Sequence, residues 1–237
     1  MTRLLYSKLR TLPLLNIAIF GGTFDPIHAG HLQAARAAAR KFRLHKILFI
    51  PAGNPPHKIT DHLTSFPHRL AMVTLACAGE PRFVPSLLEA PKPDGRHHYS
   101  IVTTRRVRRM LGPDDHLFFL IGVDAFLDMP HWKEHRRLLD LADFIVVSRP
   151  GFSHSDIANV VRRSQVRPGE AIPGQETIPL RKSTLHILRG VDVPAASHRI
   201  RAAFESGRRV TGLVPPLVEE YIRKEGLYRP GRTGTKP

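Results

Sequence analysis

The residues best suited to chemistry lie in one segment, GGTFDPIHAGH at positions 21–31. Glycines let a backbone approach a phosphate closely, and a helix N-terminus directs free N–H groups at an anion. His28 and His31 are three residues apart, so one helical turn places both rings on the same side. Two imidazole donors beside a helix N-terminus suit a polyphosphate that gains negative charge during a reaction. The segment therefore predicts a site for a polyphosphate substrate.

This segment differs from the two common glycine-rich nucleotide motifs. It has neither the GxxxxGK[ST] spacing of a P-loop nor the GxGxxG spacing of a dinucleotide fold. A glycine pair after a strand is most often only a turn, and a buried histidine is most often a hydrogen-bonded core residue. The complete string G-x-F-D-P-x-H-x-G-H distinguishes the segment from these simpler interpretations.

The elements around the segment predict the fold. Short apolar runs alternate with helical patterns, which predicts an α/β, Rossmann-like, doubly wound parallel sheet with helices on both faces. Strands are expected at 17–20, 46–50, 82–84, 116–121, 144–148 and 184–188. Helices are expected at 31–41, 66–78, 100–111, 131–139, 155–163, 197–205 and 216–224.

The same patterns suggest how the chain is divided. The segment 152–182 has little periodicity, so we expect a mobile loop after its helix. The expected parts are an N-terminal extension (1–15), the α/β core (16–190), a small C-terminal helical segment (191–228) and a disordered tail (229–237).

Ligands of doubly wound sheets bind at the carboxyl ends of the strands. Three segments that could do chemistry follow expected strands, at 21–31, 51–58 and 122–124. We therefore expect these three segments to form one site.

Composition limits the classes of partner. The net charge of +16 over 237 residues favours polyanions such as nucleic acids, membrane surfaces or phosphorylated metabolites. No nucleic-acid-binding pattern accompanies the basic cluster at Arg105–Arg109, which we interpret as a solvated helix face. No apolar run approaches the roughly 20 residues that span a bilayer, and no signal peptide is evident, so a cytoplasmic protein is expected. The single cysteine, Cys77, lies in an apolar helical run and is expected to be buried and unreactive.

Further segments carry a resemblance to a known family. The segment 21–31 resembles the signature of the nucleotidylyltransferase superfamily, and Trp132 stands in the string MPHWK. Residues 17–228 are similar to the bacterial nicotinate-mononucleotide adenylyltransferases of that superfamily. The other matching segments are IPAGNPPHK at 50–58, HYS at 98–100, IGVDAF at 121–126, SRPG at 148–151 and EGLY at 225–228.

The resemblance implies a reaction. The adenylyl group of ATP is expected to pass to nicotinate mononucleotide, giving nicotinate adenine dinucleotide (deamido-NAD) and pyrophosphate in NAD biosynthesis. A phosphate is already nucleophilic at neutral pH, so alignment and charge stabilisation suffice without a general base. Mg²⁺ is the expected cofactor and would arrive with ATP, because it keeps its waters and needs few protein ligands. His131 and His135 lack an HExxH motif and a third ligand, so they are interpreted as a solvent-facing helix.

The resemblance also implies roles for individual residues. His28, His31 and Lys58 are expected to be catalytic by binding phosphates and the developing charge. Trp132 is expected to stack on the pyridine ring, and Asp124 to accept hydrogen bonds from the adenosine ribose. Lys58 as an ordinary loop lysine and Asp124 as a helix cap are the alternatives. The residues expected to bind ATP are Gly21, Gly22, Thr23, Phe24, His28, His31, Gly122, Asp124, Ser197, Ile200 and Arg201. The residues expected to bind the mononucleotide are Gly22, Thr23, Asn54, His57, Lys58, Tyr99, Ser100, Trp132 and Arg149.

One segment departs from the family pattern. Where the family has Ile-Ser-x-Thr-x-Ile-Arg at the start of a late helix, this chain has AASHRIR. Ile200 and Arg201 match, and Ser197 is expected to cap the helix. Ala196 and His198 replace two hydroxyl residues. ATP affinity or the geometry of closing is therefore expected to differ from the family's.

Two other functions stay open at this point. A sister adenylyltransferase would prefer nicotinamide mononucleotide or phosphopantetheine, although a phosphopantetheine enzyme would be shorter and lack the features at Tyr99 and Trp132. A non-catalytic, basic nucleic-acid-binding protein would explain the charge and the altered late helix, and would bind RNA in a salt-dependent way without ATP turnover. Neither nucleic acid nor a membrane is the expected partner. The sequence does not determine whether the protein forms a homo-oligomer, or how strongly it prefers the acid mononucleotide over the amide.

Overall fold

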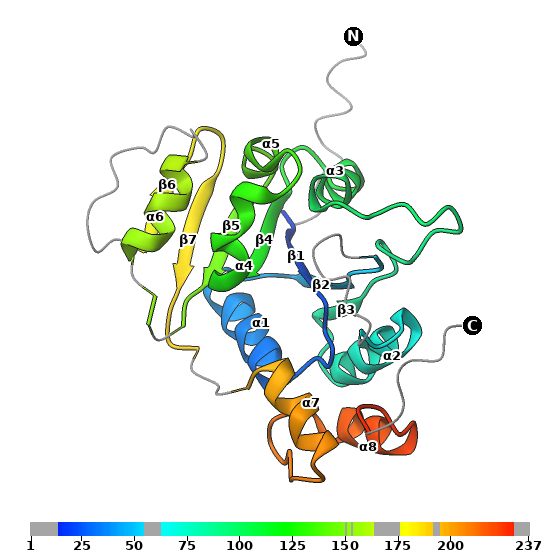
Figure 1. The fold of residues 1–237 in the computed structure, drawn as a ribbon. Coiled ribbons are helices and arrows are strands. Elements are labelled where there is room, and N and C mark those ends of the chain that lie inside the picture. The colour runs from blue at the N-terminus through cyan, green and yellow to red at the C-terminus, as the bar shows by residue number, and fades with distance from the viewer. Residues whose placement is uncertain are drawn as a thin grey trace.

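A seven-stranded sheet forms the centre of the fold. A computed structural model describes residues 14–54, 63–149, 151–152, 154–163, 176–191 and 195–229. The strands are β1 (Asn16–Gly22), β2 (Lys46–Pro51), β3 (Phe83–Pro85), β4 (His116–Gly122), β5 (Asp143–Val147), β6 (Thr177–Pro179) and β7 (Thr184–Leu188). Their order is β3-β2-β1-β4-β5-β7-β6, and all neighbours are parallel except β6 and β7 (Figure 1). The predicted doubly wound sheet is confirmed, with one antiparallel edge strand.

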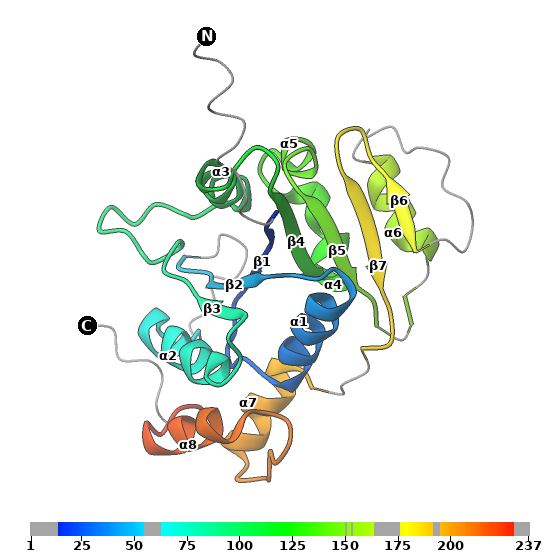
Figure 2. The ribbon, with the colours of Figure 1, turned by 180° about the vertical axis from the view of Figure 1, so that it is seen from behind.

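Helices cover both faces of this sheet, as Figures 1 and 2 show from opposite sides. They are α1 (Ala29–Lys41), α2 (Phe66–Cys77), α3 (Ser100–Met110), α4 (Val123–Leu127), α5 (His135–Leu139), α6 (His154–Arg163), α7 (Ser197–Glu205) and α8 (Pro216–Lys224), with a 3₁₀ turn, η2, at Met129–His131. Alternate side chains of a strand point to opposite faces. Ala18 and Phe20 of β1 therefore pack with α1, α2, α7 and α8, whereas Ile19 packs with α3, α4, α5 and α6.

The crevice of this fold lies between β1 and β4. From β1 the chain builds outward through β2 and β3, then returns to β4 on the other side of β1 and continues to β5 and β7. The connections that follow β1 and β4 therefore leave in opposite directions, which opens a crevice at the carboxyl ends of the strands. Gly22 ends β1 and Gly122 ends β4 at this opening.

The single helix predicted at 131–139 is wrong. A 3₁₀ turn ends at residue 131, and α5 begins only at His135. Between them, Glu134 has a φ of 51°, a left-handed conformation that a right-handed helix cannot contain. Its carboxylate accepts a hydrogen bond from Arg105 at 2.8 Å. Trp132 lies in the extended backbone between the two short helices.

Two short elements have no clear sequence signal. The helix α4 has five residues and the strand β6 has three, too few for an apolar period to be recognised. Of the segment 152–182, residues 164–175 lie outside the described part, as do 1–13 and 230–237. The predicted loop, extension and tail therefore stay predictions, and so does the division into parts.

Two further observations concern individual helices. Cys77 is buried at the end of α2, as predicted, and burial raises the pKa of its thiol to about 12. Figures 1 and 2 show α7 and α8 together at the end of the molecule beyond α1 and α2. No helix of the described ranges combines the length and the apolar character needed to cross a membrane.

Candidate active site

Two cavities open at the carboxyl ends of β1 and β4. We call the larger, of about 450 Å³, the aromatic cavity, because Tyr99, Phe119 and Trp132 line it. We call the smaller, of about 250 Å³, the histidine cavity, because His31 lines it. The residues that line both are Gly21, Gly22, Thr23, Gly122, Asp124 and Ala125. Ligands in the two cavities would therefore meet at Gly21–Thr23, where β1 ends, a segment that we call the glycine turn.

The glycine turn is open toward the cavities and tightly packed behind. No atom lies within 4 Å of the position that a Cβ of Gly21 would take. A Cβ on Gly22 would come within 3.0 Å of the Phe24 ring, which is itself buried. The backbone at this turn can thus approach a ligand. Phe24 is packed in the core and also lines the histidine cavity, so its contact with ATP stays a prediction.

A buried arginine supports the turn from behind. Arg69 of α2 is only 1% exposed. Its Nη1 donates to the Thr23 carbonyl at 2.9 Å, and its Nε donates to the Thr64 carbonyl at 2.8 Å. Burial lowers the pKa of Arg69, while the nearby Asp25 raises it. The sequence analysis missed this residue, because the pattern around it indicates only an apolar helix.

The two histidines stack at the start of α1. Their ring centroids are 3.7 Å apart with an interplanar angle of 28°, so the prediction that both lie on one side is confirmed. The backbone N–H of His28 donates to Nδ1 of His31 at 3.3 Å. A neutral imidazole that accepts at Nδ1 carries its proton on Nε2. His31 therefore has an N–H donor to offer in the cavity that it lines.

His28 differs from His31 in its burial. It is only 2% exposed, and its Nδ1 has no hydrogen-bond partner among the described residues. Burial, with a smaller contribution from the charge of Arg149, lowers the pKa of His28 to about 4. His28 is therefore neutral at physiological pH. In this structure it lies behind His31 and does not line either cavity.

An ion pair joins two residues that line the histidine cavity. Arg149, which follows β5, lies 3.1 Å from Asp124 between Nη1 and Oδ2. Asp124 stands in the first turn of α4 and makes no capping hydrogen bond, since Gly122 is the N-cap. Arg149 lines the histidine cavity and not the aromatic one, and its predicted contact with the mononucleotide stays a prediction.

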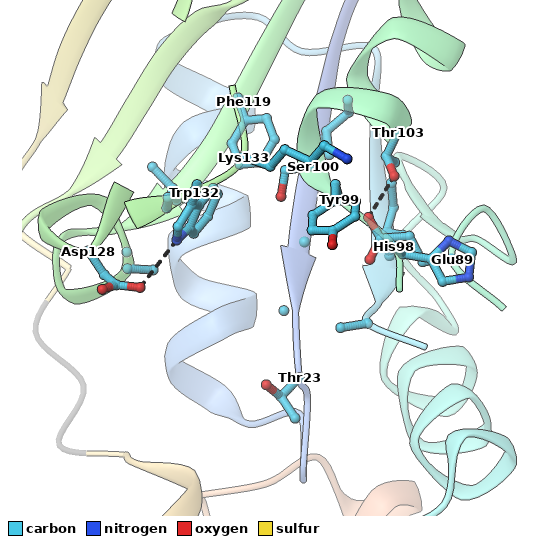
Figure 3. Close-up of a pocket in the computed structure, with 18 of the residues that line it drawn as sticks. Thr23, Glu89, His98, Tyr99, Ser100, Thr103, Phe119, Asp128, Trp132 and Lys133 are labelled. Atoms are coloured by element: carbon cyan, nitrogen blue, oxygen red, sulfur yellow. Dashed lines mark hydrogen bonds between the residues drawn. The ribbon is translucent and has the colours of Figure 1, made fainter. Parts of the chain in front are cut away.

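Aromatic side chains shape the larger cavity, which Figure 3 shows. Trp132 lies edge-on to Phe119 of β4, with centroids 6.4 Å apart. Its Nε1 donates to Oδ2 of Asp128 at 3.3 Å, and the other oxygen of Asp128 contacts His131 at 3.0 Å. Tyr99 lies across the cavity from Trp132 (Figure 3). The indole is half-buried and borders the cavity, as predicted for a residue that contacts a ligand.

The start of α3 forms another wall of this cavity. Tyr99 is its N-cap and Ser100 its first residue, and no side chain caps this end. Backbone N–H groups in the first turn of a helix lack intrahelical partners. The predicted pair Tyr99 and Ser100 thus lines the cavity at a place where backbone donors are available.

The sequence analysis missed a partly buried carboxyl group in the same cavity. Glu89 accepts a 2.7 Å hydrogen bond from the hydroxyl of Thr103. Burial raises the pKa of Glu89, and the hydrogen bond from Thr103 opposes this shift only in part. His98 lies beside it, where its Nε2 is 2.9 Å from the Ala90 carbonyl. Burial lowers the pKa of His98. No spacing in the sequence indicates that these side chains meet.

The predicted substrate loop is only partly described. Asn54 donates from Nδ2 to the Gly95 carbonyl at 3.0 Å and lines neither cavity. His57 and Lys58 lie outside the described residues, so their roles stay predictions.

The late helix packs against the loop between the glycine turn and the histidines. The Ser197 hydroxyl donates to the Pro26 carbonyl at 3.1 Å, and Nη1 of Arg201 donates to the Asp25 carbonyl at 2.8 Å. The prediction that Ser197 caps α7 is wrong, because Ala196 is the N-cap and makes no side-chain bond. Ile200 is fully buried, and its predicted contact with ATP stays a prediction. Of the three residues of α7 that were predicted to bind ATP, Ser197, Ile200 and Arg201, only Ser197 lines the histidine cavity.

Few of the described side chains lie together in a way that could bind a metal ion. No group of three His, Cys, Asp or Glu side chains with metal-binding geometry occurs in the described ranges. His131 is exposed and bound to Asp128, whereas Nε2 of His135 is buried and has no partner among the described atoms. The predicted solvent-facing pair is therefore correct for His131 alone.

Known proteins resemble this chain over most of its length. The family described as cytidylyltransferase-like matches residues 19–202. A probable nicotinate-nucleotide adenylyltransferase of Solibacter usitatus is 39% identical over 90% of this chain and 100% of that protein. The protein of the same name from Moorella thermoacetica is 38% identical over 92% of this chain and 94% of its own. A solved nicotinic acid mononucleotide adenylyltransferase of Plasmodium falciparum, complexed with NaAD, has a TM-score of 0.68 at 18% identity, over 90% of this chain and 97% of that one. That likeness concerns the fold.

Proposed function

We propose that this chain, which belongs to the cytidylyltransferase-like family and within it to the nicotinate-nucleotide adenylyltransferases, transfers the adenylyl group of ATP to nicotinate mononucleotide. An oxygen of the mononucleotide phosphate attacks the α-phosphorus of ATP. The bond from that phosphorus to the oxygen shared with the β-phosphate breaks, and its electron pair leaves with pyrophosphate. The other product is nicotinate adenine dinucleotide.

The observation that supports this proposal most strongly is the meeting of the two cavities at the glycine turn. ATP in the histidine cavity and the mononucleotide in the aromatic cavity would bring the reacting phosphates together beside Gly21. No side chain projects from that position. Alignment of two reactants in this way can supply roughly 7–11 kcal/mol of the barrier.

Charge stabilisation would come from groups around the histidine cavity. The Nε2–H of His31 and the N-terminus of α1 both favour phosphate oxygens. The guanidinium of Arg149 borders the same cavity, so we assign it to the phosphates of ATP. Neutral His28 would hold the His31 ring by stacking. Its own contact with a phosphate stays a prediction, as does the role of Lys58.

The remaining assignments follow the two cavities. We assign the adenosine ribose to Asp124, whose carboxylate lies at their junction, and the pyridine ring to the slot between Trp132 and Tyr99. The backbone at Tyr99 and Ser100 would receive the carboxylate of the nicotinate.

Magnesium would enter as part of the substrate, Mg-ATP. Phosphate oxygens and water would supply most of its ligands, because Mg²⁺ dehydrates reluctantly. A cytoplasmic location and an oligomeric form remain predictions from the sequence.

The test is formation of product by the purified protein. Mg-ATP and nicotinate mononucleotide should yield pyrophosphate and the deamido dinucleotide in equal amounts. His31→Ala removes the imidazole that lines the ATP cavity and should lower the rate at least tenfold, since one charge-stabilising donor is commonly worth 10²–10³ in rate. A wild-type rate equal to that of His31→Ala would reject the proposal. Comparing the acid mononucleotide, its amide and phosphopantetheine separates the sister activities.

A further inference from the structure

The charged side chains that line the aromatic cavity are unequally paired. Three of them are acidic, and each has a partner. Asp124 pairs with Arg149, and Asp128 holds the Trp132 indole and His131. Glu89 accepts a hydrogen bond from the Thr103 hydroxyl.

The lysine side chain that lines the same cavity is Lys133. Its Nζ lies 4.3 Å from the centroid of the Tyr99 ring. No carboxylate within the described residues forms an ion pair or hydrogen bond with it. Figure 3 shows the side chain extending from beside Phe119 to a position over Tyr99, with Ser100 next to it. An ammonium group thus borders the slot in which the pyridine ring is placed.

The start of α3, which lies beside this ammonium, is itself positive. Lys133 lies over the N-cap of α3, and the first turn of that helix has no acidic residue. A helix N-terminus carries a partial positive charge, so an ammonium beside it is unfavourable until an anion arrives. His98, the other basic group of the cavity wall, is bound to the Ala90 carbonyl.

We propose that Lys133 makes the enzyme prefer a mononucleotide whose pyridine ring bears a carboxylate over one whose ring bears an amide. The inference rests on the proposed function, because it takes the pyridine ring to lie between Trp132 and Tyr99. A carboxylate at the start of α3 would stand next to the ammonium, whereas an amide carries no charge to attract it. The phosphate is common to both substrates and would lie at the glycine turn, so it cannot produce the difference.

The experiment compares the two mononucleotides in two independent measurements. Trp132 is the single tryptophan of the chain, so its fluorescence reports binding without requiring turnover. The kcat/KM of each substrate with Mg-ATP is the second measurement. Lys133→Met should weaken binding and kcat/KM about tenfold for the acid and less than about twofold for the amide, as expected for one partly exposed charge pair. Lys133→Arg keeps the charge and should retain the acid preference.

Lys224→Met is the matched control, because Lys224 is exposed on α8 and lines neither cavity. It should leave both substrates unchanged. Lys133→Glu should weaken the acid further while sparing the amide. Equal losses for both substrates in Lys133→Met, or no loss for either, would overturn the inference. If the wild type formed no product, the proposed function would fail, and the fluorescence titrations would still decide whether Lys133 discriminates between the two rings.

Discussion

The hydroxyl of Tyr228 donates a 2.6 Å hydrogen bond to Oδ1 of Asp25, a residue 203 positions earlier in the chain. The second oxygen of Asp25 accepts from the backbone N–H of Thr64 at 3.2 Å. Its carbonyl accepts from Arg201. The C-terminal turn, the segment before α2 and the late helix are therefore all tied to the loop that joins the glycine turn to the histidines.

Tyr228→Phe should loosen this loop. The variant removes one buried hydrogen bond to a charged group, which we expect to cost about 1–3 kcal/mol of unfolding free energy. A domain of this size then melts several degrees lower, at about 2–4 °C for each kcal/mol. Because the loop leads to His28, the KM for ATP should also rise. Tyr221→Phe is the control, since Tyr221 bonds to His68 at 2.8 Å away from the loop. An ATP KM that rises equally in both variants would contradict this prediction.

Arg69→Met should damage the site without touching a substrate. The variant leaves the carbonyls of Thr23 and Thr64 without their donor, and a buried unpaired polar group costs about 1–3 kcal/mol. Thermal unfolding should show a large loss of stability, and kcat should fall because Thr23 borders both cavities. Arg223→Met removes an exposed pair with Glu219 and should change stability by less than about 1 kcal/mol. A kcat unchanged in a folded Arg69→Met protein would refute the supporting role.

His28 should make stability depend on pH. Its pKa is about 4 in the folded protein, below the ordinary value of 6.5. Between these values the unfolded chain binds a proton that the folded protein does not bind. Stability should therefore be complete above about pH 6.5 and fall as the pH decreases toward 4, by at most about 3 kcal/mol. Urea unfolding across this range measures the loss, which His28→Asn should reduce and His116→Asn, at an exposed position, should not. Equal pH dependence in all three proteins would show that His28 is not its source.

Much of the fold could be predicted, because the signals that determine it are local. Five consecutive buried residues, Leu117–Ile121, make β4 recognisable as a strand covered on both faces. The predicted spans of β7, α7 and α8 agree with the structure at both ends. The helix predicted at 131–139 failed because Glu134 adopts a left-handed backbone conformation that interrupts it. The side chain of Glu134 contacts Arg105 of α3, and a local pattern contains no information about such a partner.

The site was predictable where a segment contributes several residues together. His28, His31 and Gly21 stand in one continuous motif, and the structure places them at one strand end. Arg69 and Glu89 carry no such signal, because a charged residue in a sequence is expected at the surface. Only the tertiary fold buries Arg69 and partly buries Glu89. The wrong prediction for Ser197 has the same origin, since its hydroxyl bonds to a carbonyl 171 residues away instead of its own helix.

Two glycines should respond to alanine in opposite ways. A Cβ on Gly53 would lie 1.9 Å from the Glu89 carbonyl oxygen, a distance at which the backbone must move. Gly53→Ala should therefore destabilise the protein by more than about 1 kcal/mol, as overpacking does, and displace Glu89 from the aromatic cavity. A Cβ on Gly21 meets no atom within 4 Å, so Gly21→Ala should fold normally.

The catalytic activity of Gly21→Ala provides a second test. The new methyl group of Gly21→Ala projects to where the two cavities meet, so kcat should fall at least tenfold while the melting temperature stays near that of the wild type. Misplacing reactants by about 1 Å can cost a hundredfold in rate, which makes this effect large enough to measure. If Gly21→Ala retained full kcat, the reacting phosphates could not meet beside this glycine, because nothing else in the variant would have been altered.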